Sequence, residues 1–259
     1  MGVHSEHHGI AVTSSGPFSA DDNREFSVTP LTDNCRRVYE QGRHIVVGIS
    51  HGNSYFSVGL LTRLLGWSQE RFDEVDVIIP DDAFRENLAV LGYPPERAAR
   101  KSRQESNAIR NRVTRAAAAL PASTGIRVHL LSDLLDNPVY RAHRLRAEEA
   151  LRTDCGLLDA CLGMSRRALR TNLGGKEPTE EQVRAGARYP LAELPFFLGS
   201  ADIFGVASSL CFYHTPIPLA DYLFRNRASL APSIRQGYAT IQSSHQPSVP
   251  QEDPCTPAS

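Results

Sequence analysis

Three short apolar runs separated by helical patterns constrain the fold of this chain more than any other feature. The runs are rich in β-branched residues, which predicts buried strands over residues 44–49, 75–79 and 126–131. The segments between them have the apolar spacing of amphipathic helices. Alternating strands and helices are typical of a parallel sheet, so we expect an α/β fold.

The same patterns predict the remaining organisation. Helices are expected over 33–41, 55–65, 82–91, 95–120, 138–162, 166–173, 179–197 and 218–227, and further strands over 204–213 and 237–241. Pro190 and Pro195 should kink or end the helix that begins at Thr179. We expect residues 1–30 and 242–259 to be disordered tails and residues 31–241 to form a single domain.

Ser50 lies between Gly48 and Gly52, at the predicted carboxyl end of the first strand. Ligands of parallel sheets bind beyond these strand ends. An amphipathic run follows with Asn53 or Ser54 as the expected N-cap, so amide groups near Ser50 could stabilise an oxyanion. Ser50 is therefore a candidate nucleophile. The alternative is a tight turn in which Ser50 is only a hydrogen-bonded loop residue.

Composition excludes several classes of protein. With 41% hydrophobic residues the chain can bury a full core, and its net charge of −1 means that nucleic-acid binding would require local clustering of cations. Its five cysteines include no C-x-x-C pair, which argues against a disulfide framework or structural zinc. Neither a signal peptide nor a membrane-spanning apolar run is recognisable, so we expect a cytoplasmic protein.

Basic side chains are concentrated in the long helix predicted over 95–120. They are Arg97, Arg100, Lys101, Arg103, Arg110, Arg112 and Arg115, interrupted only by Glu105. Helical spacing places several of them on one side, which is a candidate footprint for a phosphate backbone. A solvated helix face is the alternative. No aromatic residues are interleaved, so readout of bases is not indicated.

Tyr189 and Glu193 are four residues apart, so on a helix they project from one face. A phenol beside a carboxylate can hold an ammonium group and later accept its proton. An ordinary surface contact is the alternative for this pair.

Residues 48–52 also match the G-x-S-x-G nucleophile elbow of α/β-hydrolases. That fold requires several strands before the elbow, whereas here one strand follows an expected tail. Asp202 and His214 follow Ser50 in the order that a catalytic triad requires, but a chain of this length offers such a pair by chance. A serine hydrolase is therefore the second functional hypothesis.

Together these stretches resemble the cyclodipeptide synthases. The family pattern Gly-x-Ser-x-Gly-Asn-Ser-Tyr-Phe-Ser is present over 48–57, and its Tyr-x-x-x-Glu pattern is present at Tyr189 and Glu193. The Ser-Ser-x-x-x-Tyr segment is present over 208–213, followed by His, Thr and Pro. The resemblance extends from about residue 33 to residue 238 in the same order, and it indicates the subfamily with Asn in the nucleophile loop.

The resemblance implies a Rossmann-like parallel sheet flanked by helices, similar to the catalytic domain of class Ic aminoacyl-tRNA synthetases. The HIGH and KMSKS signatures of those enzymes are missing. The implied reaction uses two aminoacyl-tRNAs and forms a cyclic dipeptide, a 2,5-diketopiperazine, without ATP, metal or cofactor. Neither DNA nor a membrane is an implied partner, and the product is a candidate substrate for a downstream tailoring enzyme. A tRNA-binding module without catalytic activity is the third hypothesis.

The resemblance also assigns roles to individual residues. The implied catalytic side chains are Ser50, Asn53, Tyr189, Glu193, Tyr213 and His214. Ser50 would attack the ester of the first aminoacyl-tRNA, and Tyr189 with Glu193 would bind the α-amino group. Tyr213, with Asn53 and His214, would position the intermediate and relay the proton during cyclisation.

Substrate-binding residues follow from the same resemblance. The first amino acid would contact Val46, Gly48, Ile78, Leu131, Phe196 and Cys211, which favours a medium or large hydrophobic side chain. The second would contact Met164, Thr171 or Asn172, and Thr215. Tyr140 is also assigned to the substrate site. The implied tRNA-binding residues are Arg97, Arg100, Lys101, Arg103, Arg110 and Arg112. Cys211 is interpreted as a small buried residue rather than a catalytic thiol.

Overall fold

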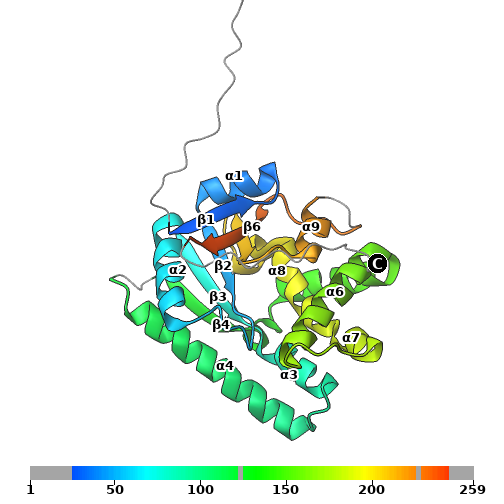
Figure 1. The fold of residues 1–259 in the computed structure, drawn as a ribbon. Helices are drawn as coiled ribbons and strands as arrows, with labels where there is room; N and C mark the ends of the chain where they lie inside the picture. Colours follow the sequence, from blue (N-terminus) through cyan, green and yellow to red (C-terminus); the bar gives the residue numbers. More distant parts are fainter. Residues whose placement is uncertain (1–24, 122–124, 226–228, 245–259) are drawn as a thin grey trace, which may run out of the picture.

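The centre of the protein is a six-stranded sheet with the order β1-β6-β5-β2-β3-β4 (Figure 1). The computed structural model describes residues 25–121, 125–225 and 229–244. The strands are β1 (Phe26–Pro30), β2 (His44–Gly48), β3 (Glu74–Ile79), β4 (Ile126–Leu130), β5 (Ser209–Tyr213) and β6 (Gln236–Ser243). Neighbouring strands are parallel except for β1, which is antiparallel to β6.

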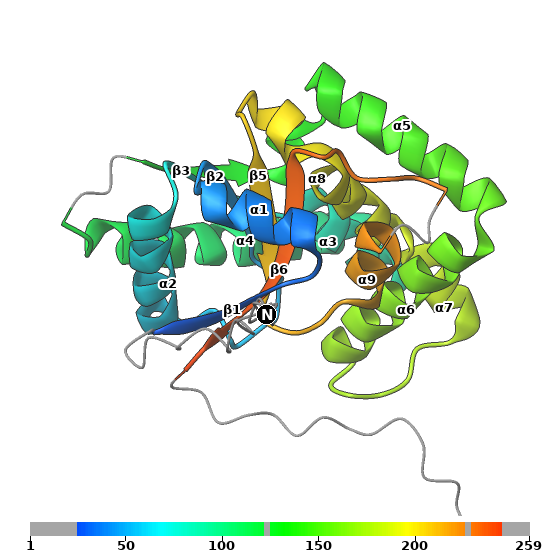
Figure 2. The same ribbon diagram turned by 90° about the horizontal axis from the view of Figure 1, so that it is seen from above.

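Helices cover both faces of the sheet (Figure 2). They are α1 (Asp33–Gln41), α2 (Val58–Arg71), α3 (Asp81–Val90), α4 (Pro95–Ala118), α5 (Pro138–Thr153), α6 (Cys155–Asn172), α7 (Glu180–Gly186), α8 (Arg188–Phe204) and α9 (Pro218–Phe224), with a 3-10 turn η1 (Leu131–Leu134). Helices α2 and α4 pack on one face, and α5, α6, α8 and α9 lie on the other.

Strand β2 has an almost continuously apolar sequence because helices cover both of its faces. Ile45 and Val47 pack with residues of α2 and α4, whereas Val46 packs with residues of α5, α6 and α8 on the opposite face. Because both faces are covered, an alternating polar pattern would bury polar groups. Each fully buried Val or Ile side chain stabilises the fold by about 1.5–3 kcal/mol.

The predicted α/β sheet flanked by helices is confirmed, and β2, β3 and β4 lie where the apolar runs placed them. Both expected tail boundaries are wrong. Residues 26–30 form β1, in which Phe26 is only 1% exposed, and residues 242 and 243 belong to β6 and pair with β1. This antiparallel edge strand also makes the sheet mixed rather than wholly parallel. Residues 1–24 and 245–259 of the expected tails lie outside the described residues, and the single-domain organisation stays a prediction.

Several helix boundaries also differ from expectation. The helix expected over 138–162 ends at Thr153, because Asp154 caps α6 by accepting from Leu157 N at 2.9 Å, and α6 then continues to Asn172. The segment from Thr179 breaks at Ala187 rather than at Pro190, which lies in the first turn of α8 where its missing N–H is tolerated.

The strand expected over 204–213 begins only at Ser209. Phe204 still belongs to α8, which continues past Pro195 with a non-helical residue at Gly199 and ends at the left-handed Gly205. Helix α9 ends at Phe224, and residues 226–227 of the expected helix lie outside the described residues.

No helix within the described ranges combines the length and apolar content needed to cross a membrane. The cysteines that these ranges contain are free thiols.

Candidate active site

The site lies where the chain connections diverge from the middle of the sheet. From β2 the chain proceeds to β3 on one side, whereas β5 pairs with β2 on the other. In α/β sheets such a switch point opens a crevice beyond the carboxyl ends of the strands. Ser50 follows the end of β2, and Tyr213 is the last residue of β5. The Ser50 hydroxyl lies 3.3 Å from the Tyr213 hydroxyl.

Residues 50–57 form the nucleophile loop, which has no helix or strand. Gly52 has a φ of 71°, a left-handed conformation that favours glycine. Asn53 accepts a hydrogen bond from Tyr55 N at 3.0 Å and donates one to the Tyr213 hydroxyl at 3.3 Å. The loop thus brings an amide side chain as well as a serine to Tyr213.

The expected helix start at residue 55 is wrong. Helix α2 begins at Val58, and Ser57 rather than Asn53 or Ser54 is its N-cap, accepting from Leu60 N at 3.3 Å. Ser50 is therefore separated from this helix by residues 51–57, so sequence adjacency does not place it directly before a helix N-terminus.

Tyr189 and Glu193 lie one turn apart on α8 and hydrogen-bond to each other. Tyr189 is only 7% exposed, which excludes an ordinary surface contact. Burial, together with the neighbouring carboxylate, raises the pKa of Tyr189 well above its usual value, while a hydrogen bond with Ser50 acts in the opposite direction. Burial raises the pKa of Glu193 to about 7, although the Tyr189 hydroxyl partly offsets this effect. Two phenols thus flank the Ser50 hydroxyl beside a carboxyl group that titrates near neutrality.

A cavity of about 480 Å³ connects these groups. All six predicted catalytic side chains line it, and so do most predicted substrate-binding residues: Val46, Gly48, Ile78, Leu131, Met164, Phe196 and Cys211. Both alternatives for the second substrate, Thr171 and Asn172, line it as well. The sequence interpretation missed three further lining residues: His51, which occupies a variable position of the 48–57 pattern, and Phe84 and Asn87, which belong to no motif.

Two predicted substrate-binding residues lie outside the lining of this cavity. Tyr140 is fully buried and donates to Ala192 O on α8 at 2.9 Å, so its contact is with the helix that carries Tyr189. Thr215 accepts a hydrogen bond from Arg167 at 3.0 Å, and it is Arg167, not Thr215, that lines the cavity.

His214 packs between aromatic rings at the cavity wall. Its ring centroid lies 4.1 Å from that of Tyr55 and 4.3 Å from that of Tyr213. Burial and, to a smaller extent, Arg167 lower the pKa of His214 to about 4. The imidazole is therefore neutral at neutral pH.

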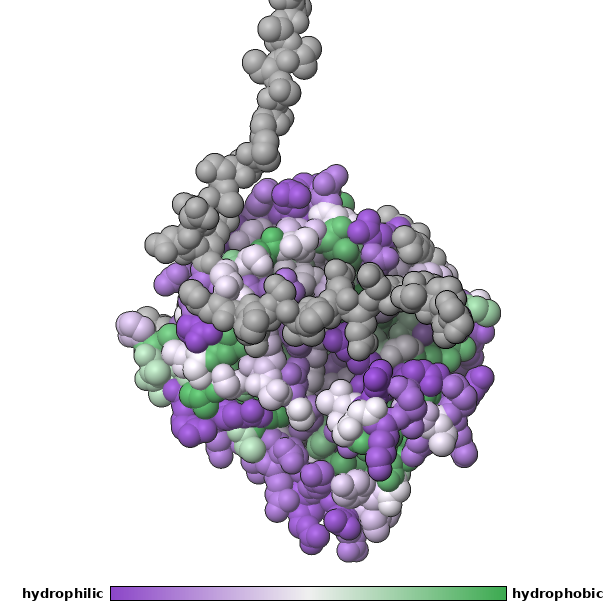
Figure 3. Space-filling view, in the orientation of Figure 1, coloured by the Kyte–Doolittle hydropathy of each residue, from purple (hydrophilic) through white to green (hydrophobic). Residues whose placement is uncertain are grey.

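Helix α4 combines a buried apolar stripe with an exposed basic surface. Ile109 and Val113 are buried, whereas Arg97, Arg100 and Arg103 are exposed. Hydrophilic residues cover the lower part of the molecule in Figure 3, where Figure 1 places the amino-terminal part of α4. The remaining predicted tRNA-binding residues, Lys101, Arg110 and Arg112, are half-buried.

A second cavity lies between this helix and the nucleophile loop. It is lined by Gly52, Asn53 and Ser54 on one side and by α4 residues that include Arg112 and Arg115 on the other. The carboxyl-terminal half of the basic helix thus lies next to the loop that carries Ser50.

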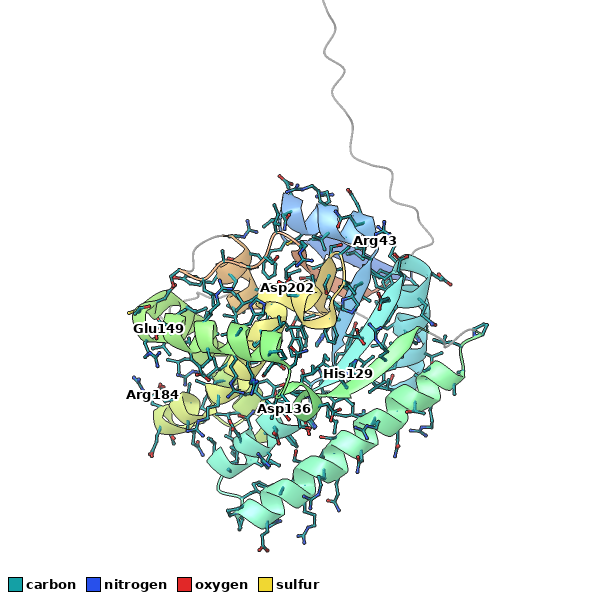
Figure 4. All side chains as sticks on the ribbon, turned by 180° about the vertical axis from the view of Figure 1, so that it is seen from behind. Arg43, His129, Asp136, Glu149, Arg184 and Asp202 are labelled. Atoms are coloured by element: carbon teal, nitrogen blue, oxygen red, sulfur yellow. The ribbon has the colours of Figure 1, made fainter. Side chains whose placement is uncertain are left out.

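A buried ionic cluster that the sequence interpretation missed lies on the same sheet face as Val46. The Asp76 carboxylate accepts from Arg127 at 2.7 and 2.9 Å and lies 2.8 Å from both His44 Nε2 and His129 Nε2, the latter labelled in Figure 4. His44 Nδ1 lies 2.7 Å from the Ser209 hydroxyl. Burial alone would raise the pKa of Asp76, but these hydrogen bonds hold it well below its usual range. The cluster connects β2, β3, β4 and β5.

The structure does not assemble the hydrolase triad considered from the sequence. Asp202 forms an ion pair with Arg235 and lies 3.8 Å from His143 Nε2, and it does not line the cavity that contains His214. Across the described residues, no group of three or more His, Cys, Asp or Glu side chains is arranged to hold a metal ion.

Fold and site define an α/β protein with a Rossmann-like topology and a serine-bearing loop beside two tyrosines at the switch point. A family model described as cyclodipeptide synthase matches residues 26–243. The chain belongs to the cyclodipeptide synthase family.

Several relatives agree with this assignment. The cyclo(L-leucyl-L-leucyl) synthase of Bacillus subtilis is 35% identical over 222 residues, covering 84% of this chain and 89% of the relative. The cyclo(L-tyrosyl-L-tyrosyl) synthase of Mycobacterium tuberculosis is 35% identical over 220 residues, covering 83% and 75%. The assigned activities of these relatives differ in the amino acids that are joined.

Solved structures of the family share the fold. The enzyme of Staphylococcus haemolyticus superposes with a TM-score of 0.78 at 27% identity, covering 85% of this chain and all of that one. A Mycobacterium tuberculosis structure gives a TM-score of 0.75 at 32% identity, covering 85% and 94%, and was described as demonstrating that the family is related to type I tRNA synthetases. The predicted resemblance to those synthetases is thereby confirmed at the level of fold.

Proposed function

We propose that this protein joins the aminoacyl groups of two aminoacyl-tRNAs into a cyclic dipeptide through ester intermediates on Ser50. The observation that carries the proposal is the convergence of Ser50, Tyr189, Glu193 and Tyr213 on one cavity, in a chain that belongs to the cyclodipeptide synthases. Asn53 supports membership of the subfamily with Asn in the nucleophile loop.

The proposed chemistry consists of four acyl transfers. Ser50 Oγ attacks the ester carbonyl of the first aminoacyl-tRNA, the terminal ribose hydroxyl leaves, and an aminoacyl ester forms on Ser50. The α-amine of the second aminoacyl-tRNA attacks this ester and releases Ser50, so that a dipeptide is esterified to the second tRNA. Ser50 Oγ then attacks the ester of this dipeptidyl-tRNA, the ribose hydroxyl of the second tRNA leaves, and the dipeptide becomes esterified to Ser50. Finally the dipeptide's own amine attacks its ester carbonyl, closing the ring and releasing Ser50.

Tyr189 and Glu193 are suited to hold the α-amino group of the first substrate. A carboxyl group with a pKa of about 7 exists in both forms at neutral pH, and a bound ammonium would favour the ionised form. The same carboxylate can accept the proton when the amine must become a nucleophile. Both roles require the side chain to face the cavity, which Glu193 does.

Tyr213, Asn53 and His214 would position the intermediate and relay the proton during cyclisation. The Tyr213 hydroxyl contacts both Ser50 and Asn53 at 3.3 Å, so it can pass a proton to or from the Ser50 oxygen. His214 is neutral at neutral pH and packs against the Tyr213 ring, which suits a positioning role.

No ATP is required in this scheme, because each substrate already carries an activated ester. The protein supplies a nucleophile and positioning, and effective molarities of well-positioned groups can reach about 10⁵ M or more. The exposed cations of α4 would hold tRNA phosphates, and the apolar wall around Val46 and Ile78 would favour a hydrophobic first amino acid.

Mass spectrometry of the culture medium tests the proposal after expression in bacteria. We expect new diketopiperazines with the protein and none with its Ser50→Ala variant at equal expression. A product that persists in the variant contradicts the role of Ser50. Hydrolysis of simple esters without tRNA would favour the hydrolase hypothesis, and tRNA binding without any product would favour the binding module. Cytoplasmic location and a tailoring enzyme for the product remain parts of the proposal.

A further inference from the structure

Helix α4 contacts the nucleophile loop at two points. Ser106 Oγ lies 2.9 Å from His51 Nε2, and Arg112 Nη1 donates to Phe56 O at 3.1 Å. His51 directly follows the nucleophile, and Phe56 lies near the other end of the loop. The two contacts therefore fix both ends of a segment that has no regular secondary structure of its own.

Ser106 is an unusual residue for the place it occupies. The inner face of α4 is formed mainly by Ala98, Ile109, Val113 and Ala116, and besides Ser102 only Ser106 is polar there, at 2% exposure. Burying a hydroxyl without a partner is unfavourable, so the interaction with His51 determines whether serine is tolerated there.

Ser102, one turn away, provides an internal comparison. It is 4% exposed and belongs to the same buried face, but it donates to Asp81 O on α3 at 2.7 Å. The two serines thus have similar burial and one hydrogen bond each. Of these two serines, only Ser106 contacts the nucleophile loop.

His51 is held on two sides. Its ring stacks on Phe84 of α3, with ring centroids 4.1 Å apart and an interplanar angle of 4°, and the residue is 6% exposed. Burial lowers its pKa to about 4; Asp81 opposes this shift and Arg112 adds to it. The neutral ring is therefore fixed by stacking in one direction and by the Ser106 hydroxyl in another.

We propose that His51 and Ser106 are positioning residues, which hold the nucleophile loop on α4 so that the Ser50 hydroxyl stays between Tyr189 and Tyr213. The inference rests on the proposed function, because it concerns acylation of Ser50. It also means that the helix proposed to bind tRNA on its outer surface holds the nucleophile on its inner surface. A displacement of about 1 Å at a reacting group can cost on the order of 100-fold in rate.

The matched variants Ser106→Ala and Ser102→Ala test this inference in a single-turnover assay of Ser50 acylation by aminoacyl-tRNA. We expect Ser106→Ala to slow acylation at saturating aminoacyl-tRNA by about tenfold or more. The aminoacyl-tRNA concentration that gives half of the maximal rate should change by no more than about twofold. Ser102→Ala should lower the melting temperature by about as much as Ser106→Ala does, but its acylation rate should stay within about twofold of the wild-type rate. Equal rates for the two variants would overturn the inference.

A double-mutant cycle separates positioning from general destabilisation. His51→Phe keeps the stacking on Phe84 and removes the nitrogen that contacts Ser106. The double variant His51→Phe/Ser106→Ala should acylate no more slowly than the slower single variant, because both changes break one contact. Multiplied losses would show that the two residues act independently.

Hydrogen exchange gives a readout that does not require activity. We expect amides of residues 50–57 to exchange about fivefold faster in Ser106→Ala than in the wild type, and to be unchanged in Ser102→Ala. If the wild-type protein is never acylated, the proposed function fails, and exchange alone then decides the positioning role. Equal exchange in both variants would overturn it.

Discussion

At the residue scale, the site combines Ser50 with Tyr189 and Glu193, whose pKa values are raised by burial. Ser50 and the Tyr189–Glu193 pair were predicted because separated motifs follow one family pattern in the same order. The family pattern could not predict Phe84 or Asn87, which line the same cavity but belong to no motif. Nor could it show that Tyr140 points toward Ala192 rather than into the cavity, because that depends on how α5 packs on α8.

Glu193→Gln should reduce acylation and stabilise the protein at alkaline pH. The raised pKa means that the neutral carboxyl is favoured in the folded state, so its contribution to stability is complete below about pH 4.5 and is lost as the pH rises through about 7. We expect denaturant unfolding at pH 8 to show a gain of roughly 1–3 kcal/mol for the variant, and little gain at pH 4.5.

The same variant lacks the charge that would bind an ammonium group. Acylation of Ser50 should fall by about 10- to 100-fold, as expected for loss of a hydrogen bond to a charged group. Identical stability differences at the two pH values would contradict the raised pKa. Tyr189→Phe is a useful comparison, because it removes the hydroxyl next to Glu193 without removing the carboxyl group.

At the scale of elements, the strands with covered faces were predictable and the edges were not. β2 is apolar from Ile45 to Val47 because α2 and α4 cover one face and α5, α6 and α8 the other. β1 is recognisable only through its pairing with β6, since Phe26 lies opposite Ser243 at the far end of the chain. The break at Asp154 was missed because the apolar pattern continues on both sides of it, and only the cap to Leu157 N shows where α6 begins.

Helix α4 should bind tRNA through its exposed cations. Arg100→Gln/Arg103→Gln removes two exposed charges with little effect on helix propensity. We expect weaker tRNA binding and a salt dependence, measured as the slope of log K against log salt concentration, that is reduced by about 2. The matched control is Arg36→Gln/Arg37→Gln, which removes two exposed charges from α1. Equal losses of affinity in both variants would argue against a specific role of α4.

At the scale of the whole molecule, the Asp76 cluster connects the central strands of the sheet. Asp76 has no exposed surface and binds side chains from both neighbouring strands, through His44 on β2 and Arg127 on β4. The sheet therefore combines an apolar core with one fully paired buried charge. Buried ion pairs of this kind contribute little when intact, but removing one partner is strongly destabilising.

Asp76→Asn should lower the free energy of unfolding at pH 7 by about 3–5 kcal/mol, because His44 and His129 lose the carboxylate that they contact and Arg127 keeps only its ion pair with Glu74. The depressed pKa of Asp76 means that its contribution is present above its unfolded pKa of about 4 and is lost as the pH falls below that value. Denaturant unfolding between pH 7 and pH 3 should show a smaller acid-induced loss in the variant than in the wild type. Parallel pH profiles would contradict this role.

The most direct test of the account is whether the Ser50 hydroxyl accepts an aminoacyl group. Intact-protein mass spectrometry after brief incubation with a hydrophobic aminoacyl-tRNA should show one added aminoacyl mass, with the ester mapped to Ser50 by peptide sequencing. The Ser50→Ala variant should show none. Product formed without any ester on Ser50, or an ester mapped to another residue, would contradict the account.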